Sequence, residues 1–186
     1  KHKKKGIKMK KILMSFFVAA LLSACGTAHV KTEAESADIL NYTKIYISKV
    51  DVHSQEPAAK TNQKLQEKML EWEGFAMNEL ETNIEKSRYT LIKSIDDTSP
   101  DALSLELDID LVYGSRAARY FGGFGAGKGS VDSVLKVVDP KTKEIKYSAV
   151  ANSDLSVGAF GGDMGDVLKS NVTKLIQQYF LSPSAQ

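Results

Sequence analysis

The only cysteine of the 186-residue chain, Cys25, stands directly after a short apolar run. Lysines precede this run of residues 12–22, and Ser23 and Ala24 separate it from the cysteine. A basic start, a short apolar stretch and small residues at a cleavage site are the three parts of an export signal. A helix of this length extends about 16 Å, roughly half of a ~30 Å hydrocarbon core, so the run is too short to be a durable membrane span.

The thiol of Cys25 is a nucleophile at the end of this export signal. As the only cysteine, it can form no intramolecular disulfide and no thiolate metal cluster. The segment Leu22-Ser23-Ala24-Cys25 resembles the lipobox of bacterial lipoproteins. The resemblance implies cleavage between Ala24 and Cys25 and a diacylglycerol thioether on the sulfur, with about 0.8 kcal/mol of anchoring from each buried methylene. The alternatives are an ordinary secretory signal with a chance cysteine, and a buried core helix.

Three segments follow from this interpretation. Residues 1–24 are a signal peptide, with Met9 as the expected start, residues 25–40 are the lipidated cysteine and a flexible tether, and residues 41–183 are a single globular domain. The polar tether is expected to reach roughly 20 Å. By analogy with lipoprotein sorting, Gly26 in place of an aspartate favours the outer membrane, on its periplasmic side or at the surface, over the inner membrane.

The charge of the chain changes when the signal is removed. Seven lysines and no acid lie ahead of Cys25, so 18 of the 25 basic residues remain with all 23 acids. A chain with this balance lacks the basic stripe that binding to a phosphate backbone requires. Nucleic acid is therefore not an expected partner, whereas the membrane and an envelope protein are.

A glycine-rich segment from Gly114 to Ser130 is the most conspicuous candidate for binding. Its glycines alternate from 123 to 129, so an extended backbone would have one bare face for a partner to approach. Gly122 and Gly127-Lys128 match the start of a phosphate-binding P-loop, but Gly129 stands where that loop needs a Ser or Thr for magnesium. A mobile connection between strands and a nucleotide-dependent enzyme are the other interpretations.

Cations and aromatic rings accompany these glycines. The rings are costly to leave in water, so they would cover the core or touch a partner. The cations could hold an anion such as a lipid or glycan phosphate, or could simply be solvated. The candidate residues for binding a partner or an anion are Arg116, Arg119, Tyr120, Phe121, Gly123, Phe124, Gly125, Gly127 and Lys128.

Few residues suit catalysis or metal binding. Glu106, Asp108 and Asp110 alternate along a predicted strand, where the polar face is expected to meet water. His53 is the one histidine of the predicted domain, and no G-x-S-x-G elbow presents a serine to it. We therefore expect a protein that is not an enzyme, with no catalytic residue, no metal and no cofactor other than the lipid on Cys25.

Hydrophobic periodicity predicts the elements that position these residues. A strand at 42–52 changes phase near Ser48-Lys49, which suggests a bulge. An amphipathic helix at 61–86, a second strand at 89–95, and a clearly alternating strand at 103–113 follow. Residues 131–155 are a β-hairpin about the turn Asp139-Pro140, and Asp163 could cap a final helix. The fold class is α/β (α+β), a mixed, mostly antiparallel sheet of about five strands with two packed helices, in the order β-α-β-β-β-β-α.

The lipobox, the segment from Arg116 through Lys128 and the hairpin with Asp139-Pro140 together resemble a family of bacterial lipoproteins of unknown function, over roughly residues 40–180. The resemblance implies an envelope location and no established reaction. We expect a non-enzymatic accessory or binding module of an envelope transport, secretion or assembly complex. The alternatives are a lipid or glycan carrier with a pocket between helix and sheet, and a nucleotide-dependent enzyme using the loop from Gly122 to Lys128.

Overall fold

The computed structural model of the protein describes residues 28–55, 57–95, 99–112, 129–154 and 163–182. Its elements form one α+β domain, which confirms the predicted fold class. The sheet has six strands rather than about five. In chain order the elements are β1 (His29–Glu35), the 3-10 helix η2 (Ala37–Asn41), β2 (Lys44–His53), α2 (Pro57–Thr61), α3 (Gln63–Glu85), β3 (Thr90–Ile92), β4 (Ala102–Val112), β5 (Ser130–Val138), β6 (Ile145–Asp154) and α5 (Met164–Phe180).

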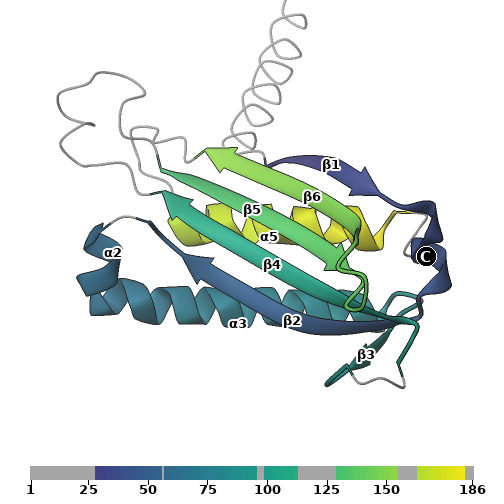
Figure 1. Cartoon of the computed structure of the whole chain (residues 1–186). Helices are drawn as coiled ribbons and strands as arrows, with labels where there is room; N and C mark the ends of the chain where they lie inside the picture. The colour runs from purple at the N-terminus through teal and green to yellow at the C-terminus, as the bar shows by residue number, and fades with distance from the viewer. Residues whose placement is uncertain (1–27, 56, 96–98, 113–128, 155–162, 183–186) are drawn as a thin grey trace, which may run out of the picture.

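The sheet is mixed, with the strand order β1-β6-β5-β4-β2-β3. Neighbours from β1 to β4 are antiparallel, whereas β2 is parallel to both β3 and β4. The parallel strands β2 and β3 are connected by α3, which forms a helical crossover. Both long helices lie on one face of the sheet (Figure 1). None of the described helices is both long and apolar enough to cross a bilayer.

The core lies between this face and the two helices. Every second residue of β4 from Leu103 to Leu111 is fully buried, while Glu106, Asp108 and Asp110 between them are partly exposed. This strand therefore has the one buried face and the one wet face that its alternation predicts. On α3, the residues Trp72, Ala76, Leu80 and Ile84 are buried, which confirms the predicted helical stripe.

Side-chain caps mark the start of both long helices, and a bulge interrupts β2. The bulge and the Asp163 cap agree with the predictions from the sequence. The Asn62 side chain accepts a hydrogen bond from the Leu65 amide at 3.2 Å, so α3 begins just after it. The pairing of β2 with β4 shifts register between Ile47 and Lys49, where the bulge was predicted. The Asp163 side chain accepts a hydrogen bond from the Gly165 amide at 2.9 Å and caps α5.

The structure corrects the predicted tether. Residues 29–35 are the edge strand β1, which pairs antiparallel with β6 from His29 opposite Asn152 to Glu35 opposite Tyr147. The segment lacks a strong apolar pattern because an edge strand pairs on one side only and needs few buried side chains. Charged side chains, such as those of Lys31 and Glu33, are typical of such an edge because they discourage pairing with other chains.

The helix η2 is held against the β5–β6 hairpin by a lysine. The side chain of Lys146 is 4% exposed, and its Nζ lies 2.6 Å from carboxylate oxygens of both Asp38 and Glu144. These hydrogen bonds hold the pKa of Lys146 above its usual range. Hydrogen bonds from Lys146 and Ser36 lower the pKa of Asp38 in turn. The contacts fix the chain between β1 and β2.

We expect the domain to lose stability in acid below about pH 3.8, the ordinary pKa of an aspartate. Hydrogen bonds from Thr43 and Lys44 lower the pKa of Asp101, as those from Lys146 and Ser36 do for Asp38. A carboxyl whose pKa is lower in the folded state stabilises the fold above its unfolded pKa, and this contribution disappears as the pH falls through the folded pKa.

Urea unfolding measured between pH 2 and pH 7 checks this expectation. The free energy of unfolding should fall less steeply with acid in the Asp38→Asn variant than in the unmodified protein. Identical slopes for the two proteins would contradict the assignment of this carboxyl.

Candidate functional site

The sites predicted from the sequence lie largely outside the described residues. Ala24 and Cys25 fall there, as do all candidate binding residues from Arg116 to Lys128. The strands that hold the two ends of the glycine-rich segment are described. Val112, the last residue of β4, pairs with Ser130, the first residue of β5, in the middle of the sheet. The segment is therefore attached to two central strands.

The ends of β2, β4 and β6 and the starts of β1 and β5 lie at the same end of the sheet. There Ser130 also pairs with Asp154 at the end of β6. The start of β1 lies at the same end, because His29 pairs with Asn152. His53 at the end of β2 lies there too, because it pairs with Asp110. We call this the attachment end; the turn between β5 and β6 lies at the opposite end (Figure 1).

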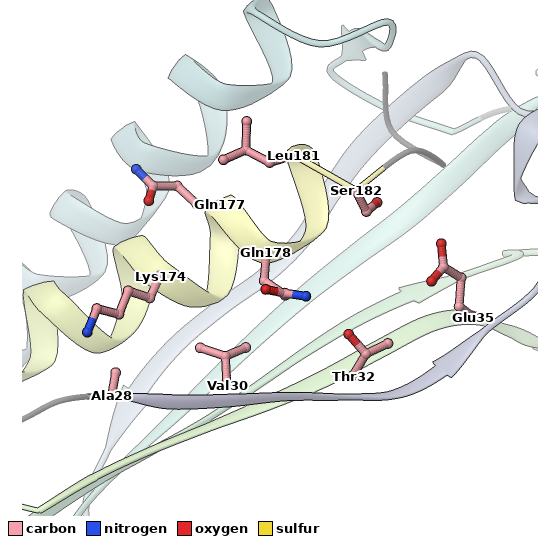
Figure 2. A pocket seen from close by; sticks show the side chains of 9 residues that line it. All are labelled: Ala28, Val30, Thr32, Glu35, Lys174, Gln177, Gln178, Leu181 and Ser182. Atoms are coloured by element: carbon pink, nitrogen blue, oxygen red, sulfur yellow. The ribbon is translucent and has the colours of Figure 1, made fainter.

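A cleft of about 580 Å³ opens between β1 and the last turns of α5 (Figure 2). It exists because β1 is an edge strand that the helices cover only in part. The lining side chains come from the helix-covered face of β1 and from the facing side of α5. They are Ala28, Val30, Thr32, Glu35, Lys174, Gln177, Gln178, Leu181 and Ser182.

Six of the nine residues that line the cleft have hydroxyl, amide or charged side chains, and the other three are apolar. Thr32 Oγ1 lies 3.3 Å from the hydroxyl of Tyr147, which is almost fully buried. Burial raises the pKa of Tyr147, so this hydroxyl stays protonated at neutral pH. Such a lining offers hydrogen-bond donors and acceptors to a polar ligand with several hydroxyl groups.

The face of the sheet opposite the helices carries a second group of polar residues. Asp51 and His53 on β2 pair with Asp108 and Asp110 on β4, so the four side chains occupy the corners of one patch. His53 Nδ1 lies 3.6 Å from Asp51 Oδ2 and 3.9 Å from Asp108 Oδ1, and His53 Nε2 lies 3.9 Å from Asp110 Oδ1. We refer to these four residues as the aspartate–histidine cluster.

Sequence reasoning missed this cluster because it depends on the pairing of two strands that are distant in the chain. Asp108 and Asp110 were expected to meet water, and His53 was considered only as a catalytic base. The alternation within each strand indicated which side chains share a face. Nothing in the alternation indicated that β2 and β4 are parallel neighbours, or that the bulge brings Asp51 opposite Asp108.

No protein-family model and no curated protein matches this chain. Among solved structures, it is similar to the PelC dodecamer from Paraburkholderia phytofirmans, with a TM-score of 0.46 and 13% identity over 81% of this chain and 95% of that one. It is also similar to a neuraminyllactose-binding hemagglutinin homologue from Helicobacter pylori, with a TM-score of 0.40 and 10% identity over 83% of this chain and 88% of that one.

A third similarity, to a PDZ domain protein from Parabacteroides distasonis, has a TM-score of 0.46 and 11% identity and covers 92% of this chain but 40% of that one. These values are too low for any of the three proteins to indicate what this chain does.

Proposed function

We propose that this protein is a cell-envelope lipoprotein, anchored to the outer membrane through lipid on Cys25, and that it acts as a non-enzymatic accessory or binding module of an envelope assembly. The proposal rests on one observation, which is that the proposed anchor and the glycine-rich segment are attached at the same end of the sheet. The strand that follows the anchor and the two strands that hold the glycine-rich segment meet at the attachment end of the sheet.

The proposed anchor is close to this end of the domain. Cys25 is four residues from His29, the first residue of β1. Four residues of fully extended chain span about 14 Å at most. If Cys25 carries lipid, the attachment end lies near the membrane surface, and the glycine-rich segment begins and ends there. A partner in the same membrane would be within its reach.

The glycine-rich segment has the composition expected of a partner-binding element on a stable base. Its three aromatic rings, Tyr120, Phe121 and Phe124, supply apolar area, and its glycines allow close approach of another backbone. The strands on either side, β4 and β5, are paired along nine residues of each. A segment fixed at both ends in this way can be presented to a partner without loss of the fold.

Replacing Cys25 tests the anchor. The Cys25→Ala variant should leave the membrane fraction and lose labelling by radioactive palmitate, because the sulfur atom that accepts lipid is gone. The Ser23→Ala variant is a control, since it keeps the sulfur and a small residue beside the cleavage site. An unmodified protein that takes up no palmitate and fractionates with aqueous proteins would overturn the proposal.

Crosslinking in cells tests the binding role. A photoreactive residue in place of Phe124 should trap one defined envelope protein. The same residue in place of Lys141, an exposed position in the turn between β5 and β6, should not trap that protein. The binding role would be rejected if position 124 trapped nothing specific, or trapped the same proteins as position 141.

A glycan-binding carrier is a second candidate function, and the cleft between β1 and α5 favours it. Native mass spectrometry of the detergent-solubilised protein should then show a copurified mass. The Gln178→Trp substitution would fill the cleft and should remove that mass. Glu81→Trp, at an exposed position on α3, is the matched control. The absence of any bound mass, or its retention in the Gln178→Trp variant, would count against a carrier.

A further inference from the structure

The aspartate–histidine cluster contains polar atoms that the surrounding protein leaves unsatisfied. His53 Nδ1 and Asp110 Oδ1 are both shielded from solvent and have no hydrogen-bond partner within the described structure. An imidazole nitrogen that is neither hydrated nor hydrogen-bonded is costly, since burying a polar group without a partner is unfavourable. Carboxylate oxygens of Asp51 and Asp108 face this nitrogen at 3.6 and 3.9 Å. A cation at this position would contact His53 Nδ1 and Asp108 Oδ1, and it would compete for Asp51 Oδ2 with Lys49, whose Nζ lies 2.9 Å from that oxygen.

The separations suit a metal ion. Ligand atoms that surround a zinc ion at about 2.0 to 2.2 Å are roughly 3.3 to 3.6 Å apart in a tetrahedron. The observed separations of the nitrogen and its two carboxylate oxygens need only a small contraction to reach this value. All of the ligand atoms in this group lie within 4.8 Å of one another.

The fourth residue of the cluster is placed to support a metal-bound histidine. A histidine that binds metal through one ring nitrogen usually donates the N–H of the other nitrogen to a carboxylate, which fixes the tautomer and the ring orientation. Asp110 Oδ1 lies 3.9 Å from His53 Nε2 and has no other partner. The second carboxylate oxygen of Asp110 accepts a hydrogen bond from Gln55 at 3.1 Å, which holds the group in place.

The negative charge of the cluster also favours the binding of a cation. Three carboxylates lie together on two adjacent strands, and neighbouring like charges across strands are unfavourable. Lys49 Nζ compensates part of this charge, at 2.9 Å from Asp51 Oδ2 and 3.1 Å from Asp108 Oδ2. These contacts raise the pKa of Lys49. Lys49 contacts the other oxygen of Asp108, so the Oδ1 atom that faces His53 remains available. At Asp51 Oδ2, a metal ion would have to displace Lys49.

We propose that Asp51, His53 and Asp108 bind a divalent transition-metal ion of the zinc class, with Asp110 orienting the histidine. Nδ1 of His53, Oδ2 of Asp51 and Oδ1 of Asp108 are the protein ligands, and water completes the coordination. The imidazole ligand selects zinc and its neighbours over calcium and magnesium, which prefer all-oxygen sites. The proposal does not depend on lipid at Cys25, and it departs from the expectation that the domain binds no metal.

Calorimetric titration of the detergent-solubilised protein with zinc chloride at pH 7 tests the site. The unmodified protein should bind about one ion per chain, while magnesium chloride should give no comparable heat. Loss of an orienting carboxylate typically weakens metal binding by about 10- to 100-fold, so Asp110→Asn should lower the affinity by about tenfold and His53→Ala by more. Lys49→Met should raise the affinity, because it removes the competing cation.

His29→Ala is the matched control. His29 lies on β1 at the same end of the sheet but on the other side of β6, away from the cluster, so its loss should leave zinc binding unchanged. In NMR spectra of the unmodified protein, zinc should shift the ring nitrogen signals of His53 and not those of His29. The proposal is wrong if zinc does not bind, if His53→Ala binds it as tightly as the unmodified protein, or if Lys49→Met weakens binding.

Discussion

The antiparallel pairing of β1 with β6 limits the distance between Cys25 and the sheet. Without it, the residues after Cys25 would be a long flexible connection, and the domain could take any orientation. Pairing from His29 to Glu35 leaves only three residues, 26–28, between Cys25 and β1. The same pairing forms one wall of the cleft against α5. The position of the proposed anchor and the cleft thus both depend on one edge strand.

The placement of both long helices on one face of the sheet is the second constraint. One face buries the large apolar residues, so the other must be polar, and charges there gather wherever strand pairing puts them. In the aspartate–histidine cluster, pairing in register brings acids from β2 and β4 together, and Lys49 compensates only part of their charge. Such a local excess of negative charge is unfavourable unless a cation or a partner relieves it.

Periodicity predicted most of the fold because each element carries its own pattern. The alternation of β4, the stripe of α3, the bulge after Ile47 and the Asp163 cap are all local properties of the sequence. The edge strand β1 was missed because its stability comes from backbone pairing with β6. This pairing does not require a recognisable apolar pattern in the residues of β1. The aspartate–histidine cluster was missed for a related reason, since it arises from pairing between distant segments.

The orientation of the lipidated protein on a membrane tests the account most directly. A fluorescent probe at Asp154, at the attachment end, can be compared with one at Lys141, in the turn at the far end of the same hairpin. The ten residues of β6 extend about 33 Å. In vesicles that contain headgroup-labelled quencher lipids, we expect much stronger quenching at Asp154 than at Lys141. Equal quenching at both positions, or stronger quenching at Lys141, would contradict the account.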